Sequence, residues 1–237
     1  MKLRTRVVLQ LAALCFALAA PSFAADTAYL YVVNGIPGRD VGANFNPGFP
    51  IDASLNSECV VRGLTFDNIS GPLSLAGGTY ELQISEANSL TPCTNPAVLT
   101  SQVTIAAGNN VSAVAALSTS GQPTLLQFSD ELSPVVAGNA RFVFANTADA
   151  SSLQATLTQV GVKNPKSYTV TAASDAQAAI TVPAGTYLIQ VVATGSTTVL
   201  ATAEIALSNQ SVSLNYVAGE SANNFLTLIN RIVRDVF

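Results

Sequence analysis

The sequence predicts an all-β protein with two tandem antiparallel β-sandwich or barrel domains behind a secretory signal peptide. Short runs of β-branched, aromatic and alternating residues recur between clusters of Gly, Asn, Pro and Ser, whereas helical periodicity is nearly absent. The segment LAGGTYELQI at residues 75–84 returns as VPAGTYLIQV at residues 182–191. A repeat spaced by about one hundred residues indicates two copies of a whole domain rather than a solenoid of small units.

The N-terminus has the pattern of a signal peptide over residues 1–24. Three basic residues precede an apolar run at residues 7–20, and small residues follow at Ser22 and Ala24, which predicts cleavage after Ala24. The run is short for a membrane span, so no transmembrane segment is expected after cleavage. Cys15 lies within the run and leaves with it. We therefore expect an exported protein in the periplasm, on the outer surface or outside the cell.

The mature chain is acidic. Removal of 24 residues leaves 237 − 24 = 213, with 10 − 3 = 7 basic and 14 acidic residues, a formal charge of 7 − 14 = −7. An acidic surface repels phosphate backbones, which argues against a nucleic-acid partner. A chain of this length is sufficient for two cores, and we place the domains at residues 25–135 and 139–237. The linker at residues 132–138 is short, so we expect the domains to touch.

Each copy is predicted to contain about six to eight strands. Within the repeat, Tyr80, Leu82 and Ile84 alternate with polar residues, which indicates a strand with one inward face. The glycines before this strand are expected to form a turn with positive φ. Strands are predicted at residues 29–33, 80–84, 98–105, 111–117 and 125–128, and at 141–145, 187–191, 199–205, 212–217 and 226–229.

The repeat continues in the second half of each copy. Residues 98–112 align without a gap with residues 199–213, an offset of 199 − 98 = 101. Residues 106–110 and 206–210 are rich in Asn and small residues, so we interpret them as matching hairpin turns.

Two cysteines remain in the mature chain, Cys59 and Cys93, both in the first copy. An even number of cysteines in an oxidising compartment predicts a disulfide that ties down the inserted segment at residues 85–96. The alternative is a pair of free thiols.

The VVN at residues 32–34, the A-G-T-Y at residues 184–187 and a leucine-rich closing strand resemble a bacterial secreted family, domain of unknown function 4397. The resemblance covers two copies, residues 28–135 and 139–237. It implies small immunoglobulin-like β-sandwiches, often found on exported or surface proteins, and no established reaction.

Catalytic candidates are few. The chain has no His, which excludes Ser-His-Asp triads, Cys-His dyads and histidine metal sites. No nucleophile-elbow, phosphate-loop or dinucleotide motif is present. We therefore expect no catalytic residues, no metal and no cofactor. A pair of carboxylates remains conceivable, although solvated acids are the favoured interpretation of Asp40, Asp52, Glu58, Asp67, Glu81 and Glu86.

The candidate contact surface is the loop at residues 41–51, which presents Phe45 and Phe49 among Asn, Gly and Pro. The alternative is a loop that folds back and buries both rings. Asn34 and Asn146 occupy equivalent places after the first strand of each copy, where a turn-capping role is favoured over a binding role.

These observations predict an exported, non-catalytic binding or spacer module of the periplasm or cell surface, with an unidentified protein or carbohydrate partner. The alternatives are a carboxylate-based enzyme acting on extracellular carbohydrate and a structural or matrix subunit joined through strand edges. The oligomeric state stays open.

Overall fold

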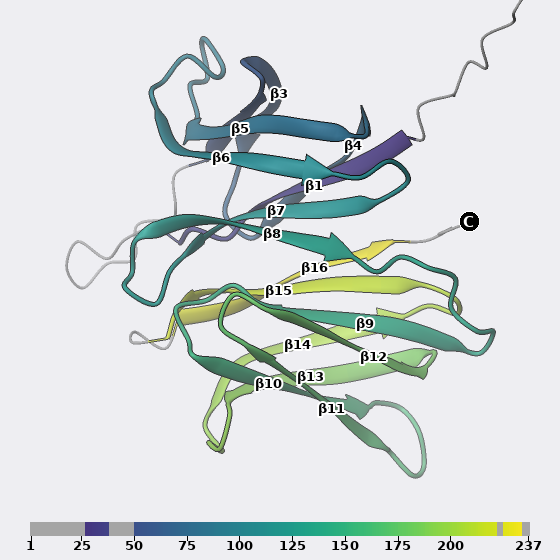
Figure 1. Cartoon of the computed structure of the whole chain (residues 1–237). Helices are drawn as coiled ribbons and strands as arrows, with labels where there is room; N and C mark the ends of the chain where they lie inside the picture. The colour runs from purple at the N-terminus through teal and green to yellow at the C-terminus, as the bar shows by residue number, and fades with distance from the viewer. Residues whose placement is uncertain (1–26, 38–49, 222–224, 234–237) are drawn as a thin grey trace, which may run out of the picture.

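The computed structural model describes residues 27–37, 50–221 and 225–233, and all regular secondary structure there is β (Figure 1). The predicted signal peptide, residues 1–24, and the predicted contact residues Phe45 and Phe49 lie outside the described residues.

The first half of the chain forms a sandwich of two four-stranded sheets. One sheet has the order β4-β1-β7-β8 and the other β3-β2-β5-β6. The strands are β1 (Thr27–Asn34), β2 (Ile51–Leu55), β3 (Glu58–Leu64), β4 (Asn68–Ala76), β5 (Gly78–Glu86), β6 (Ala97–Ile105), β7 (Asn110–Leu117) and β8 (Pro123–Asp130).

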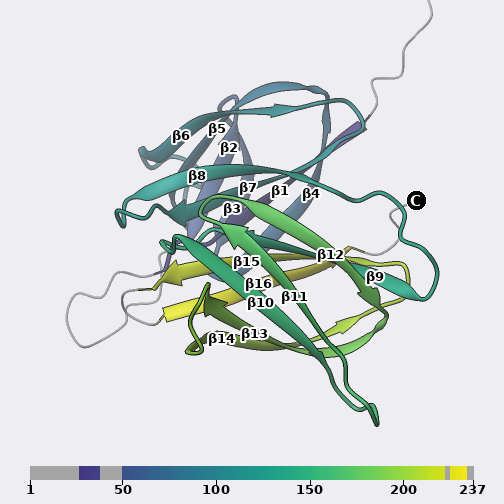
Figure 2. The same ribbon diagram turned by 60° about the horizontal axis from the view of Figure 1, so that its bottom comes forward.

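The second half repeats this arrangement strand for strand. Its sheets are β12-β9-β15-β16 and β11-β10-β13-β14, and the second of these lies on the outer side of the molecule (Figure 2). The strands are β9 (Asn139–Asn146), β10 (Ser152–Gln159), β11 (Ser167–Ala173), β12 (Gln177–Pro183), β13 (Gly185–Ala193), β14 (Val199–Leu207), β15 (Val212–Glu220) and β16 (Phe225–Val233).

The predicted all-β sandwich architecture is confirmed. Each sandwich nevertheless contains one parallel pair, β1 with β7 and β9 with β15, among otherwise antiparallel neighbours. The strand order also differs from that of a constant-type immunoglobulin domain, in which the first strand pairs with the second. The likeness to immunoglobulins therefore holds for the layered architecture and not for the order of strands.

Each sandwich has its own core, built from alternate residues of its strands. In the first, Leu30 of β1 meets Leu82 and Ile84 of β5, and all three are buried. In the second, Phe142 and Phe144 of β9 pack with Tyr187 of β13. The inward face predicted for the repeated strand is confirmed.

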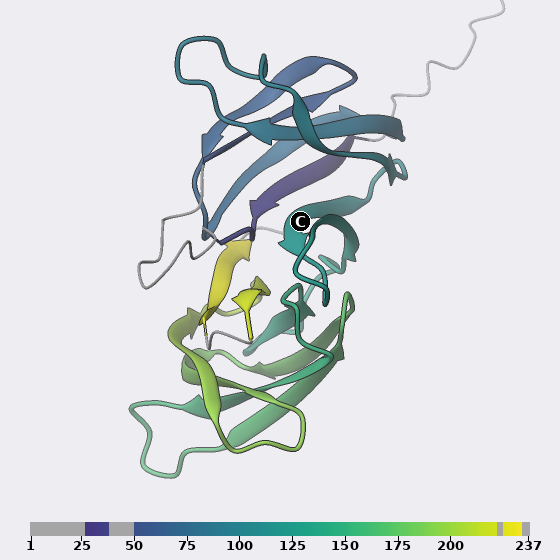
Figure 3. The same cartoon turned by 90° about the vertical axis from the view of Figure 1, so that its left-hand side faces the viewer.

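A third buried cluster joins the two sandwiches. The sheet β4-β1-β7-β8 faces the sheet β12-β9-β15-β16, so the molecule has four layers (Figures 1 and 3). The inner strands β7 and β15 are consequently buried on both faces, which explains why their sequences lack polar alternation. The cluster contains Tyr31, Val33, Val114, Ala116, Phe128, Leu132 and Val135 from the first half, and Val143, Ala145, Val212, Leu214, Tyr216, Ala218 and Ile229 from the second.

The alignment predicted from the sequence, residues 98–112 with residues 199–213, is wrong by one residue. Gly78 pairs with Ile105 across β5 and β6, whereas the equivalent Gly185 pairs with Leu207 across β13 and β14. The offset there is 207 − 105 = 102 instead of 101. Because side chains alternate between the two faces, a shift of one residue would exchange the inward and outward faces of the strand.

The turns predicted as hairpins have the expected backbone but connect different sheets. Asn109 N donates to Ala106 O at 3.0 Å and Gly108 has φ 77°. The equivalent turn has Gln210 at φ 57°. Since β6 pairs with β5 and β7 pairs with β1 and β8, the turn carries the chain from one sheet to the facing one.

The explanation offered for the repeated glycines is also wrong, because Gly77, Gly78 and Gly185 all have φ outside the positive region. At Gly77 the cause is close approach, since a Cβ there would lie 2.6 Å from the amide nitrogen of Ala107. Gly78 and Gly185 instead lie beside the ring of the tyrosine two residues ahead on the same strand face.

Candidate functional site

A cavity of about 750 Å³ opens at the margin of the junction between the two sandwiches. The first sandwich and the linker contribute most of the wall, and the second sandwich contributes Val233 at the end of β16. The lining residues are Tyr29, Tyr31, Pro72, Gly108, Asn109, Asn110, Ser129, Asp130, Glu131, Leu132, Ser133, Pro134 and Val233.

Strand geometry explains how the polar and aromatic groups meet there. Tyr29 and Tyr31 are two residues apart on β1, so both project from the face that is turned towards the second sandwich. Asp130 ends β8 and pairs with Asn110, the first residue of β7. The strand ends therefore bring two phenol rings and a carboxylate to one wall of the cavity.

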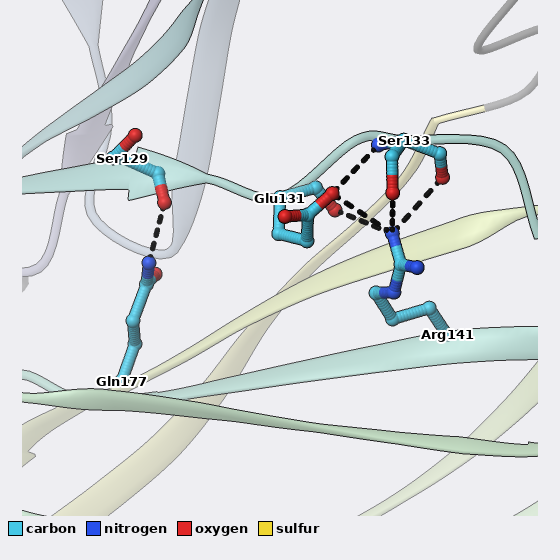
Figure 4. A network of polar contacts seen from close by, with 5 residues as sticks. All are labelled: Ser129, Glu131, Ser133, Arg141 and Gln177. Atoms are coloured by element: carbon cyan, nitrogen blue, oxygen red, sulfur yellow. Dashed lines mark hydrogen bonds and ion pairs between the residues drawn. The ribbon is translucent and has the colours of Figure 1, made fainter.

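The linker that forms the rim is held by a polar network (Figure 4). Arg141 Nη1 donates to the carbonyl oxygens of Glu131 and Ser133 at 3.1 and 2.9 Å, and it lies 3.4 Å from Glu131 Oε1. Near the end of β8, just before the linker, the carbonyl oxygen of Ser129 accepts a hydrogen bond from Gln177 Nε2. Side chains of the second sandwich thus fix the backbone on which the cavity is built.

Asp130 is the buried acid of the cavity, and the residue as a whole is only 6% exposed. Ser112 Oγ donates to its Oδ2 at 2.6 Å. Tyr216 OH, from the second sandwich, donates to Ser112 Oγ at 2.6 Å and lies 3.4 Å from Asp130 Oδ1. Burial raises the pKa of Asp130 to about 6, although both hydroxyl contacts act in the opposite direction.

The same environment acts on the neighbouring phenols. Burial, followed by the charge of Asp130, raises the pKa of Tyr216. Burial also raises the pKa of Tyr31, whose ring lies 5.2 Å from the guanidinium carbon of Arg231. No Lys or Arg among the described residues forms a salt bridge with Asp130.

None of the residues of this cluster was predicted as a site residue from the sequence, although a signal was present. Asp130 is in phase with Leu126 and Phe128 along β8, both of which face the second sandwich. Tyr216 is likewise in phase with Leu214 on β15. An acid in phase with inward apolar residues indicates a buried carboxylate.

The duplicated asparagines have the turn-capping role that the sequence favoured. Asn34 Nδ2 donates to Leu64 O at 2.9 Å, and its Oδ1 accepts from the amide of Ile36. Asn146 makes the equivalent contacts with Ala150 O and the amide of Ala148. Both side chains are fully buried and satisfied by backbone, which leaves them unsuited to ligand binding.

The duplicated tyrosines are also structural. Tyr80 OH donates to Ala76 O and Tyr187 OH donates to Pro183 O, each at 2.7 Å and four residues back along the chain. Tyr187 is fully buried, whereas Tyr80 is partly buried at the edge of its core.

A disulfide joins Cys59 to Cys93, with Cα atoms 5.7 Å apart. Beside it, the buried carboxylate of Asp52 accepts from the amides of Gly63 at 2.8 Å, Asn88 at 3.1 Å and Cys93 at 2.8 Å. Burial alone would raise the pKa of Asp52, but the three backbone donors outweigh it and the pKa is lowered. The disulfide and this carboxylate together anchor the inserted segment.

The other acids named in the sequence analysis have separate surroundings. Asp67 accepts from Thr227 Oγ1 at 3.5 Å across the junction, and Glu81 accepts from Gln83 Nε2 at 2.6 Å. Glu58 and Glu86 are exposed at strand ends. Asp40 lies outside the described residues.

Within residues 27–37, 50–221 and 225–233, no group of three or more His, Cys, Asp or Glu is arranged to hold a metal ion. The same part of the chain contains no helix of the length and apolar character needed to cross a membrane.

Comparison with known proteins identifies one family. The model of the family described as "Domain of unknown function (DUF4397)" matches residues 28–156, more than half of the chain. The match covers the first sandwich except Thr27 and extends into β10 of the second. No curated protein matches the chain.

Several solved structures have low similarity to the chain. A candidate cell adhesion protein from Bacteroides ovatus is 12% identical over 90% of this chain and 100% of its own, with a TM-score of 0.29. One from Bacteroides uniformis is 10% identical over 87% and 97%, with a TM-score of 0.30. The Bacillus anthracis TIE protein is 12% identical over 82% and 32%, with a TM-score of 0.24. These values are too low to bear on function.

Proposed function

The chain belongs to the family described as domain of unknown function 4397, and from this membership we propose that it is an exported, non-catalytic binding module of the cell envelope or cell surface. In this proposal the two sandwiches act as one rigid body, and the cavity at their junction is the binding site. The second half, residues 139–237, is proposed to be a second copy of the family domain.

The observation that supports this proposal most is the buried face shared by the two sandwiches. Apolar residues of β1, β7 and β8 pack against those of β9, β15 and β16 as in a domain core. Interfaces between independent domains of one chain are usually more polar and permit relative motion. A fixed junction keeps the walls of the cavity in place, which lowers the entropic cost of binding.

Export is supported by the disulfide and by the predicted signal peptide. Disulfides persist in oxidising compartments and are rare in the cytosol. The anchoring of the inserted segment by Cys59, Cys93 and Asp52 depends on that bridge being formed.

Cell fractionation followed by N-terminal sequencing tests the proposal. Expression of the full chain in a bacterial host should yield a mature protein that begins at Ala25 and is recovered outside the cytoplasm, with both cysteines protected from alkylation. Recovery of the uncleaved chain in the cytoplasm would reject export.

A carboxylate-based hydrolase is a second candidate, because two acids of opposite character line the same cavity. Burial raises the pKa of Asp130, whereas hydrogen bonds from Ser133, followed by Arg141, lower the pKa of Glu131. Acid and base roles in hydrolases are commonly assigned to such pairs. Release of reducing ends from bacterial polysaccharides by the wild type, abolished in both Asp130→Asn and Glu131→Gln, would establish the enzyme and refute the non-catalytic proposal.

A further inference from the structure

We propose that the junction cavity binds the basic side chain, Lys or Arg, of a partner protein, with the carboxylate of Asp130 as its counter-ion and the ring of Tyr29 along its alkyl stem. This inference rests on the proposed binding function and specifies the chemical class of the ligand.

The surroundings of Asp130 favour a cationic ligand. The carboxylate is buried and accepts hydrogen bonds from hydroxyls, yet no cation of the described residues pairs with it. Ionised groups away from water are unfavourable unless they are paired. Asp130 also lines an open cavity, so a cation can reach it from solvent. An ammonium or guanidinium group would provide the missing charge.

An exposed aromatic ring also favours a cationic ligand. Tyr29 is 37% exposed and lines the cavity together with Tyr31. Cations bind over phenol rings, and the methylene stems of Lys and Arg cover apolar surface. The guanidinium carbon of Arg231 already lies 5.2 Å from the centre of the buried Tyr31 ring, so the ring open to a ligand is that of Tyr29.

The volume of the cavity suits a long side chain. A cavity of about 750 Å³ lies within the range of sites that hold drug-sized ligands, roughly 300 to 1,000 Å³. It therefore has room for a long side chain and part of the peptide that carries it. The acidic mature chain, with formal charge −7, favours the approach of a basic partner.

Other charged and titratable groups surround the cavity. Tyr29 and Tyr31 of β1 line it, Tyr216 of β15 contacts Asp130, and Arg231 of β16 lies over the Tyr31 ring. Glu131 follows Asp130 in the linker and is paired with Arg141. Burial raises the pKa of Asp130 to about 6, so its carboxyl group changes charge between pH 5 and 7.5.

Isothermal titration of the mature protein, residues 25–237, with capped tripeptides tests the inference. The probes are acetyl-Gly-Xaa-Gly-amide, in which Xaa is Lys, Arg, citrulline or norleucine. At pH 7.5 we expect the Lys or the Arg peptide to bind about tenfold more tightly than its uncharged counterpart, norleucine or citrulline respectively, since an ion pair worth about 1.4 kcal/mol changes affinity tenfold. Equal affinity for charged and uncharged probes would overturn the inference.

Variants locate the site. Asp130→Asn keeps the shape and hydrogen-bonding capacity of the side chain and should weaken binding of the basic probe about tenfold. Tyr29→Ala should also weaken it. Glu204→Gln, an exposed acid of β14 in the outer sheet of the second sandwich, is the matched control and should leave affinity unchanged. An Asp130→Asn protein that retains its fold and full affinity would contradict the inference.

The pH dependence supplies an independent readout. With a pKa of about 6, Asp130 is about one tenth ionised at pH 5. Since the uncharged side chain is expected to bind about tenfold more weakly, affinity should fall about fivefold from pH 7.5 to 5 in the wild type and stay constant in Asp130→Asn. Binding by a chain that stops at Val233, but not by the full chain, would make residues 234–237 the occupant and reject a partner protein. Failure of all probes in a correctly exported protein would reject this inference alone, whereas cytoplasmic retention would reject the proposed function whatever the probes show.

Discussion

Two buried carboxylates in the first sandwich have pKa values displaced in opposite directions, and their hydrogen-bond donors explain the difference. Asp130 contacts only hydroxyl groups, so burial dominates and its pKa rises to about 6. Asp52 accepts from three backbone amides, which stabilise the ionised form more than burial disfavours it. The negative charge of Asp52 therefore stabilises the folded state, whereas that of Asp130 destabilises it.

Asp130→Asn is expected to stabilise the protein at neutral pH. Because the folded pKa is raised, the folded state holds the proton more tightly than the unfolded state. Stability is then highest below the unfolded pKa of about 4 and falls as pH rises to about 6. The variant should be more stable than the wild type by on the order of 1 to 3 kcal/mol at pH 7.5 and similar near pH 4. Urea unfolding at both pH values measures the difference, and a less stable variant at pH 7.5 would contradict it.

Asp52→Asn is expected to have the opposite effect. The loss of charge from three backbone hydrogen bonds should destabilise the protein by about 1 to 3 kcal/mol at pH 7. Because the folded pKa is lowered, the wild-type advantage is present above the unfolded pKa of about 4 and is lost as pH falls through the folded value. Hydrogen exchange should show faster exchange of the Asn88 and Cys93 amides in the variant. Unchanged exchange would mean that the disulfide alone orders the segment.

Among the strands, the repeated pair β5 and β13 shows what could be predicted from sequence. Alternation identified their inward residues correctly, because periodicity depends on the strand alone. The six strands β2, β3, β4, β10, β11 and β12 were not predicted, since they are short or have mixed polarity. The turns at residues 106–110 and 206–210 connect facing sheets but were predicted to be hairpins. A tight turn has the same local sequence whether the next strand lies in the same sheet or in the facing one.

Tyr187→Phe and Tyr80→Phe form a matched pair at this repeated strand. Each variant loses one hydrogen bond from a tyrosine hydroxyl to a carbonyl oxygen four residues back. Tyr187 is fully buried, and we expect the loss of its hydrogen bond to destabilise the protein by about 1 kcal/mol. Tyr80 is more exposed and should show a smaller effect. Urea unfolding of both variants checks the order, and a larger loss for Tyr80→Phe would contradict it.

For the molecule as a whole, the junction between the sandwiches is the feature that the sequence predicted least. The short linker indicated contact but not which faces meet. The apolar runs of β7 and β15 are typical of strands buried on both sides, yet such runs do not identify the second layer. Asp130, Tyr216 and the cavity depend on that pairing of sheets, and for this reason the candidate site became visible only in the structure.

Scanning calorimetry of the mature, disulfide-bonded chain tests most directly whether the two sandwiches share a core and behave as one body. Strong coupling through the buried face predicts a single transition in which the calorimetric and van't Hoff enthalpies agree, as in a single cooperative domain. Two separate transitions, or a calorimetric enthalpy about twice the van't Hoff value, would show that the sandwiches unfold independently and would contradict the shared core.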